Sequence, residues 1–227
     1  MRYLFFDIEC ANSLNNVCKM CSFGYLITDE NFNVIEKEDI VIDPEDTFDY
    51  YLFKKNSDTQ LAYSRTFFYS QMPFTGHYKR IRSILEDEYD GIFGFSVIND
   101  LKYIHDSCFR YKYRQIKVQA YDVAEIIRAF DKSTNGLEAQ IKKLFGEKKD
   151  HIKSHKSDDD AYMTSLALKK VTEILEVSIS ELLFLSGAKK LQYIWKKKKQ
   201  PRKKITPKDD TIKSTESPPV IELNTEL

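Results

Sequence analysis

The apolar residues of this chain fall first into short runs and later into helical repeats. Tyr3–Asp7 opens with four consecutive apolar residues and predicts a buried strand. Residues 22–28 and 33–43 (SFGYLIT and NVIEKEDIVID) predict two further strands, and the turn-forming residues 29–33 between them predict a hairpin. Residues 45–75 are rich in aromatic side chains but show no clear period, so the pattern assigns no element there.

Helices and strands alternate in the second half of the chain. The apolar spacing predicts helices over 77–89, 99–113, 135–146 and 157–175 and strands over 91–97 and 118–124. Asn99 or Asp100 is expected to cap the second of these helices, and Gly146 to end the third. This alternation predicts a layered α/β domain, with a mixed central sheet of about five strands flanked by helices. The sheet would combine the antiparallel hairpin with parallel strands.

Composition changes sharply after Trp195. Residues 196–227 are rich in Lys, Pro, Ser and Thr and lack apolar periodicity, which is typical of a disordered tail. The tail holds nine Lys/Arg against five Asp/Glu, although the whole chain carries 35 of each. We therefore expect a domain over 1–195 and a basic tail over 196–227. The tail would contact nucleic-acid phosphates, or it is a solvated linker or partner-binding arm.

The chain shows no export or membrane signal. No run of about 18 apolar residues indicates a membrane span, and no signal-peptide pattern opens the sequence, so a cytoplasmic location is expected. The four cysteines (Cys10, Cys18, Cys21 and Cys108) are then expected to be reduced thiols. Cys18 and Cys21 form a single C-x-x-C without the second pair that a zinc site needs, which favours buried thiols over a metal or redox role.

Acidic residues follow predicted strands and open a predicted helix. Asp7 and Glu9 lie two apart at a strand end, so their side chains share a face. Asp100 follows the strand over 91–97, and Asp160 lies in the first turn of the last helix. Ligand sites of layered α/β domains gather at strand ends and helix N-termini, so these acids are expected to converge. Because four carboxylates repel each other, a pair of divalent cations, Mg²⁺ or Mn²⁺, is expected between them.

Each of these residues alone has a simpler interpretation. Asp7 could end a strand, Asp100 could cap a helix, and His155 could be a surface histidine. Asp158 and Asp159 are expected to face solvent or cap the last helix, because only Asp160 has a histidine five residues before it. Order, spacing and context together favour metal-dependent chemistry. The aromatic residues Tyr63, Phe67 and Phe68 could stack on bases, but core positions are favoured for them.

Three stretches of the sequence resemble the motifs of the DnaQ-like 3′–5′ exonucleases, the DEDD superfamily with a ribonuclease H-like fold. FDIE is similar to the first motif, GFSVINDLKYI to the second and HKSDDDA to the third, and the likeness covers about residues 1–175. The matched positions are Asp7 and Glu9, Gly94, Asp100 and Leu101, and His155 and Asp160. The His-x4-Asp spacing of the third motif indicates the histidine subclass, DEDDh.

The resemblance implies a metal-dependent exonuclease that releases mononucleotides from single-stranded 3′ ends of DNA or RNA. It implies that Asp7, Glu9, Asp100 and Asp160 hold two ions and that His155 is the general base. Cys10 and Phe95 stand where the family often has Thr and His, so these two positions are expected beside the terminal nucleotide. A polymerase or another replication or repair protein is a candidate partner. The alternative is a non-catalytic module that binds nucleic acid or a polymerase.

Overall fold

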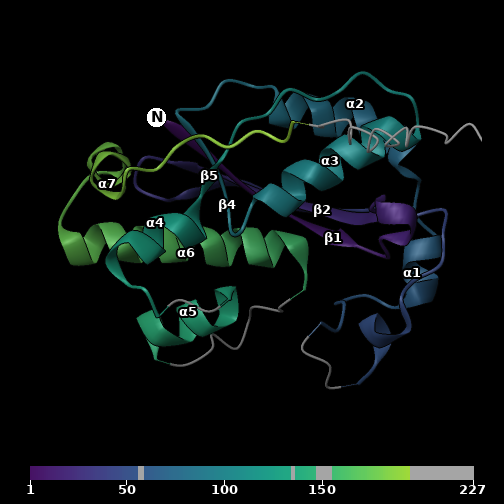
Figure 1. The fold of residues 1–227 in the computed structure, drawn as a ribbon, viewed down its shortest axis with the longest axis horizontal. Coiled ribbons are helices and arrows are strands. Elements are labelled where there is room, and N and C mark those ends of the chain that lie inside the picture. The colour runs from purple at the N-terminus through teal and green to yellow at the C-terminus, as the bar shows by residue number, and fades with distance from the viewer. Residues whose placement is uncertain (56–58, 134–135, 147–154, 195–227) are drawn as a thin grey trace, which may run out of the picture. The chain divides into compact units, whose positions relative to one another are not determined.

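A five-stranded mixed sheet lies at the centre of the structure (Figure 1), a computed structural model that describes residues 1–55, 59–133, 136–146 and 155–194. The strand order is β3-β2-β1-β4-β5. The strands are β1 (Arg2–Cys10), β2 (Met20–Asp29), β3 (Val34–Val41), β4 (Gly91–Gly94) and β5 (Tyr121–Asp122). β1, β2 and β3 pair antiparallel, whereas β4 pairs parallel with both β1 and β5. The predicted sheet of an antiparallel hairpin plus parallel strands is confirmed.

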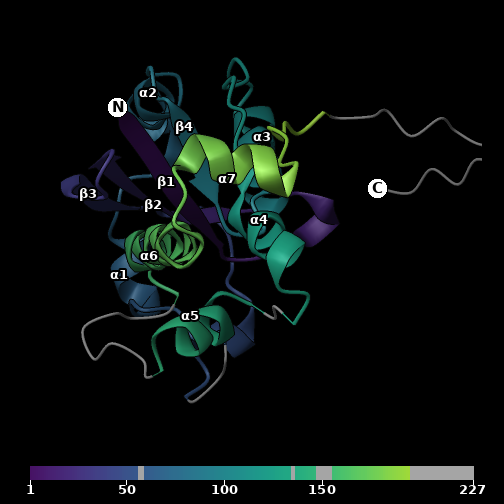
Figure 2. The ribbon, with the colours of Figure 1, turned by 90° about the vertical axis from the view of Figure 1, so that its left-hand side faces the viewer.

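Helices cover both faces of this sheet. The α-helices of the described residues are α1 (Arg65–Tyr69), α2 (Phe74–Leu85), α3 (Ile98–Arg110), α4 (Val123–Phe130), α5 (Leu137–Phe145), α6 (Ser157–Leu175) and α7 (Ile179–Ser186). In Figure 1, α2 and α3 lie on one side of the strands and α4 and α6 on the other. Figure 2 shows α6 nearly end-on beside the sheet.

The side-chain alternation of β1 separates the two cores. Leu4 and Phe6 are fully buried in the core shared with α2 and α3, whereas Phe5 is fully buried in the core shared with α4, α6 and α7. Side chains two residues apart on a strand point to the same face. Asp7 therefore follows Phe5 on the α6 face, and this alternation decides which helix can approach it.

Several predicted boundaries in the second half are wrong. The predicted strand 91–97 ends at Gly94, and the predicted helix 77–89 spans Phe74–Leu85. The segment 118–124 contains only the short strand β5, because the Asp122 carboxylate accepts a hydrogen bond from the Ala124 N–H and starts α4 at once. Helix α3 begins one residue before Asn99, and its N-cap is Val97. Asp100 does not cap it, because the Asp100 carboxylate is directed at the backbone of β1 instead.

The aromatic segment 45–75, which the pattern left unassigned, forms a small core of its own. Phe68 on α1 is fully buried there beside Phe48, while Tyr63 packs against the cluster. Phe67 on the same helix is 42% exposed. The core interpretation of Phe68 is confirmed. Helix α7 was also absent from the prediction, although Ser178 and Glu181 form a capping box at its start.

Cys18, Cys21 and Cys108 are buried free thiols, as predicted, and Cys10 is half-buried. Within the described ranges, no helix combines the length and apolarity that crossing a membrane would require. Residues Met1–Ile194 form one unit. The basic tail over 196–227 lies outside the described residues, and its boundary remains a prediction.

Candidate active site

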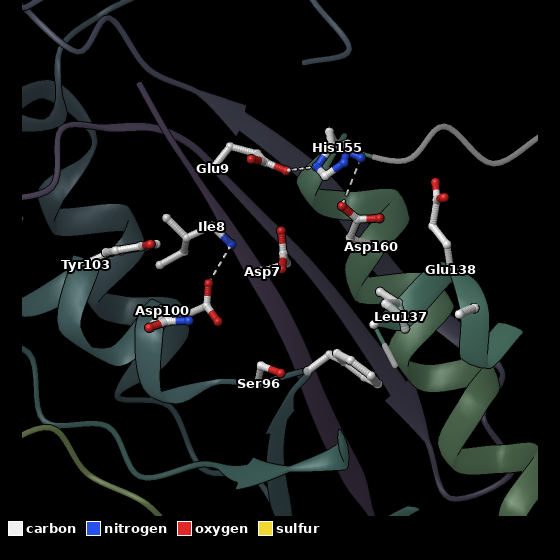
Figure 3. Close-up of a pocket in the computed structure, with 14 residues that line it drawn as sticks. Asp7, Ile8, Glu9, Ser96, Asp100, Tyr103, Leu137, Glu138, His155 and Asp160 are labelled. Atoms are coloured by element: carbon white, nitrogen blue, oxygen red, sulfur yellow. Dashed lines mark hydrogen bonds and ion pairs between the residues drawn. The ribbon is translucent and has the colours of Figure 1, made fainter. Parts of the chain in front are cut away.

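A pocket of about 640 Å³ lies where β1, α3 and α6 meet (Figure 3). Its lining contains all five residues that the motifs predicted as catalytic: Asp7, Glu9, Asp100, His155 and Asp160. Asp7 and Glu9 come from β1, Asp100 from the first turn of α3, and Asp160 from the first turn of α6. Three segments that are far apart in the sequence thus bring their acidic side chains to one hollow.

Gly24 on β2 allows the start of α6 to approach the sheet so closely. Gly24 is the register partner of Asp7. A Cβ atom at this position would lie 2.0 Å from the backbone carbonyl carbon of Ser157 and 2.0 Å from the nitrogen of Asp158. The first turn of α6 therefore rests directly on the backbone of β2. This contact places Asp160 beside Asp7.

Asp100 is tied to the same strand by a hydrogen bond. The Ile8 N–H of β1 donates to Oδ1 of Asp100 over 3.1 Å. Asp100 is only 5% exposed. A buried carboxylate is stable only when its charge or its hydrogen-bonding capacity is compensated, and the strand supplies one donor. This hydrogen bond therefore determines which face of α3 is turned toward the pocket.

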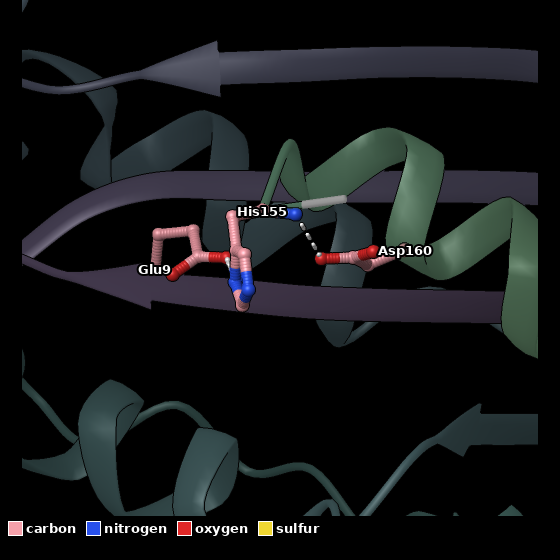
Figure 4. Close-up of side chains that lie close together, drawn as sticks. All are labelled: Glu9, His155 and Asp160. Atoms are coloured by element: carbon pink, nitrogen blue, oxygen red, sulfur yellow. Dashed lines mark hydrogen bonds and ion pairs between the residues drawn. The ribbon is translucent and has the colours of Figure 1, made fainter. Parts of the chain in front are cut away.

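His155 precedes α6 and contacts two of the acids (Figures 3 and 4). Its Nδ1 lies 3.3 Å from Oε1 of Glu9, and its backbone N–H donates to Oδ2 of Asp160 over 3.0 Å. Its carbonyl accepts a hydrogen bond from the Ala62 N–H over 3.1 Å. Its backbone adopts φ 58°, in the left-handed region. These contacts hold the imidazole at the edge of the pocket.

Burial and neighbouring negative charges raise the pKa values of three acids in the pocket. Burial, followed by the charges of Asp100 and Glu9, raises the pKa of Asp7 well above its usual value. Burial likewise raises the pKa of Asp100 well above its usual value. The pKa of Asp160 rises to about 9 because of burial and then the charges of Asp7 and Glu9. At neutral pH such groups hold protons unless a positive charge compensates them.

Divalent ions fit this donor set better than the protein's own cations. Among the described residues, the lining of the pocket includes no lysine or arginine. Ligand atoms of Glu9, His155 and Asp160 all lie within 4.8 Å of one another. Carboxylate oxygens are the ligands that Mg²⁺ and Mn²⁺ prefer. The residues present therefore suit hard divalent ions.

Of the two predicted substrate contacts, Phe95 lines the main pocket, and Cys10 lines an adjoining pocket of about 280 Å³. The two pockets have four lining residues in common: Ile8, Glu9, Tyr103 and His155. Tyr103 was not predicted. It lies three residues after Asp100 on α3, a spacing that places both on one helix face, so the sequence held a signal for it.

Two further lining residues belong to the stretch that resembles the second motif: Ser96 in the turn before α3 and Asn99 in its first turn. Three others on α5 were missed altogether: Leu137, Glu138 and Ala139. The last three had no signal, because the position of α5 across the pocket depends on tertiary packing.

Asp158 and Asp159 do not face solvent, which corrects the prediction. They are 5% and 7% exposed, and both pair with Lys37 of β3. The Lys37 Nζ lies 3.0 Å from Oδ2 of Asp158, and Lys156 lies 2.7 Å from its Oδ1. The sequence could not reveal this pairing, because Lys37 and the two acids meet only when α6 packs on β3.

Asp39 of β3 is linked through Ser22 to the start of α6. Its ionisation is expected to make the free energy of unfolding depend on pH. Its carboxylate accepts a hydrogen bond from Ser22, whose Oγ lies 2.7 Å from Oγ of Ser157. Burial raises the pKa of Asp39 from 3.8 to about 6. Because the folded-state pKa is the higher one, the folded state binds this proton more tightly. The protonated Asp39 carboxyl therefore adds to the free energy of unfolding at pH values below its unfolded-state pKa. This contribution is lost as the pH rises through about 6.

Replacing Asp39 with Asn should therefore raise the free energy of unfolding by about 2 kcal/mol near neutral pH and leave it nearly unchanged near pH 4. Thermal denaturation at both pH values measures this. The matched control is the half-buried Asp131. Hydrogen bonds from Lys143 and Ser133 lower the pKa of this carboxyl to about 2. Asp131→Asn should not stabilise the protein at neutral pH. An equal gain for Asp39→Asn at both pH values would contradict the explanation.

The comparisons with known proteins concern the fold. No family model and no curated protein matches the sequence. Escherichia coli exonuclease I, solved with a dA16 oligonucleotide, superposes with a TM-score of 0.61 at 18% identity, over 81% of this chain and 42% of that one. A 3′-exonuclease solved in recognition of a histone mRNA stem-loop superposes with a TM-score of 0.63 at 11% identity, over 76% of this chain and 64% of that one.

The chain thus spans less than two thirds of the length of either exonuclease. The likeness establishes that it has the fold of the ribonuclease H-like exonucleases, as the sequence motifs implied.

Proposed function

We propose that this protein is a metal-dependent 3′–5′ exonuclease that removes mononucleotides from single-stranded ends of DNA or RNA. The observation that carries the proposal is the convergence of Asp7, Glu9, Asp100 and Asp160 with His155 in one pocket. The fold supports it, because exonuclease I, solved with a dA16 oligonucleotide, and the 3′-exonuclease of the histone mRNA stem-loop share this fold.

In this proposal the four acids hold two divalent ions, Mg²⁺ or Mn²⁺. Bound there, such ions supply a water that ionises near neutral pH and offset the charge that develops on the scissile phosphate. The acidic side chains of the pocket would position these ions. Asp7 lies between the α3 and α6 acids, and Glu9 lies on the side of His155 (Figure 3).

His155 accepts the proton of the attacking water. Its usual pKa lies near neutrality, which suits a general base. Nδ1 faces Glu9 at 3.3 Å, and this contact orients the ring. The backbone of His155 is left-handed, and its carbonyl accepts the Ala62 N–H, so the side chain is held at the edge of the pocket.

Replacing His155 with Gln is expected to lower kcat by about 100- to 10,000-fold, the range that general bases contribute. KM should change little, because His155 contributes to proton transfer rather than to binding of the strand. Steady-state cleavage of a labelled oligonucleotide measures both constants. His105→Gln is the control, because His105 stacks on Phe109 outside this pocket. A His155→Gln variant with normal kcat would remove His155 from the mechanism.

The walls of the pocket are expected to bind the terminal nucleotide. Phe95 and Leu137 present apolar surface for a base, while Ser96, Asn99 and Tyr103 offer polar groups to the sugar. The described lining holds no cation for the phosphate, so the bound metal ions would have to supply that charge.

The test is digestion of matched DNA and RNA oligonucleotides, labelled at the 5′ end, with Mg²⁺ or Mn²⁺. Stepwise shortening from the 3′ end, absent with a chelator and absent for Asp7→Asn, is the expected result. Comparison of the two substrates shows which sugar is preferred. Tight binding of the strand with no shortening under any metal would instead favour the non-catalytic binding module.

A protein partner is also proposed. Exonuclease I has been solved in complex with an SSB C-terminal peptide. By analogy we propose a replication or repair protein, or a polymerase, as the partner of this chain. Co-purification from cells tests this.

A further inference from the structure

We propose that Asp122 is a positioning residue of the active site, which holds the turn between β4 and α3 in the shape that directs Asp100 at β1. The expected effects on metal binding and cleavage rest on the proposed function, whereas the positioning of Asp100 by Asp122 does not. Asp122 itself does not line the pocket. It is 7% exposed and lies at the end of β5, where it is the register partner of Gly94 on β4.

The Asp122 carboxylate joins two elements through one oxygen. Oδ1 accepts a hydrogen bond from the Ser96 N–H over 2.9 Å and another from the Ala124 N–H over 2.9 Å. The second bond is an ordinary N-cap of α4. The first is not part of any helix cap, because Ser96 lies in the turn that follows β4. Asp122 therefore reaches across to a neighbouring segment whose side chains line the active site.

The turn that Asp122 holds is strained and tightly packed. Ser96 has φ 54°, in the left-handed region that a serine seldom adopts. A Cβ atom at Gly94 would lie 2.5 Å from Cγ2 of Val97 and 3.2 Å from the carbonyl oxygen of Phe6, so the turn folds back on itself. A strained turn persists only when surrounding groups determine it. The Asp122 carboxylate supplies such a group at the strained residue itself.

The geometry of this turn determines where Asp100 lies. Helix α3 starts at Ile98, two residues after Ser96, and Asp100 is in its first turn. Oδ1 of Asp100 must meet the Ile8 N–H at 3.1 Å while the carboxylate still faces the pocket. A rotation of the first turn of α3 would break this bond and move Asp100 away from Asp7. Asp122 thus acts on the proposed metal site through Ser96 and the start of α3.

Asp122→Ala removes both hydrogen bonds, and its effects can be measured without catalysis. Hydrogen exchange at the Ser96 and Ile8 amides should become about tenfold faster, because the Ser96 N–H loses its acceptor and Asp100, the acceptor of the Ile8 N–H, is no longer held in place. Mn²⁺ affinity, measured by calorimetry on the full chain, should fall about 10- to 100-fold, the range for partners that orient metal ligands. Asp122→Asn keeps a carbonyl oxygen at Oδ1 and should retain Mn²⁺ affinity within about threefold.

Two further variants separate this role from ordinary helix capping. Ser178→Ala removes the N-cap of α7, which does not contribute to the pocket, so it should lower the melting temperature without changing Mn²⁺ affinity. Ser96→Gly combined with Asp122→Ala should recover much of the lost Mn²⁺ affinity, because glycine adopts a positive φ without strain. A role confined to capping α4 predicts no such recovery.

The outcomes are distinct. Normal Ile8 exchange together with normal Mn²⁺ affinity in Asp122→Ala would overturn the inference, and so would a double variant no better than Asp122→Ala. If Asp122→Ala does not fold, the double variant and Asp122→Asn still decide the point. If the unaltered protein binds no Mn²⁺, the proposed function fails, whereas exchange at Ile8 continues to report whether Asp122 positions α3.

Discussion

Replacing Asp7 with Asn is expected to abolish metal-dependent cleavage and, in the same protein, to raise the melting temperature of the metal-free form. The variant keeps the shape of the side chain but removes the central charge of the pocket. Cleavage should fall about 1,000-fold or more, which corresponds to the several kcal/mol that bound ions contribute to the transition state. Oligonucleotide digestion at saturating Mn²⁺ measures this loss.

The gain in stability follows from the same carboxylate. Burial and the neighbouring Asp100 and Glu9 raise the pKa of Asp7, so its charged form is unfavourable in the folded protein without ions. An amide carries no charge, and relief of this kind contributes about 0.5–2 kcal/mol. Thermal melts in a chelator test it.

Asp87→Asn is the matched control, because Asp87 is an exposed acid paired with Arg2. It should change neither activity nor melting temperature appreciably. An Asp7→Asn protein that still cleaves at the normal rate would show that the acid cluster does not hold catalytic ions.

Replacing Gly24 with Ala is expected to have the largest effect on folding. Its Cβ would meet the backbone of Ser157 and Asp158 at 2.0 Å, and backbone cannot move aside as a flexible side chain does. The start of α6 must shift outward, which should cost about 3 kcal/mol or more in the free energy of unfolding. Chemical denaturation measures this loss. Because Asp160 lies in that first turn, activity of the folded fraction should also fall.

Gly76→Ala is the control for Gly24→Ala. Gly76 lies in α2, where a Cβ would meet only the flexible side chain of Met72, at 3.3 Å. Alanine favours a helix over glycine by roughly 0.5–1 kcal/mol, so this variant should be neutral or slightly more stable. Similar losses for both variants would contradict the close packing of α6 on β2.

The acid motifs could be predicted from the sequence because each depends on local chemistry. Asp7 and Glu9 end an apolar run, and their spacing of two places them on one face whatever the rest of the chain does. The spacing of His155 and Asp160 before a long amphipathic segment is equally local. The apolar runs likewise determined the sheet, since the strand pairing follows from a hairpin and two strand-to-helix units.

Helix boundaries and the burial of charged residues were harder to predict, because a side chain can have a local and a distant partner that compete. Asp100 looked like a helix cap, but its carboxylate bonds to the Ile8 N–H, so Val97 occupies the cap position. Asp158 and Asp159 looked exposed because a run of acids usually faces water. In the folded chain both acids pair with Lys37, more than a hundred residues earlier, and Asp158 also pairs with Lys156.

The sequence by itself determined which residues carry the proposed chemistry, because charge, spacing and apolar period are properties of neighbouring residues. Tertiary structure alone decided how these residues are held: Gly24 under α6, Ser96 against Asp122, and α5 across the pocket. The physical reason is that such contacts join segments distant in the chain, and their geometry depends on packing that no local pattern encodes.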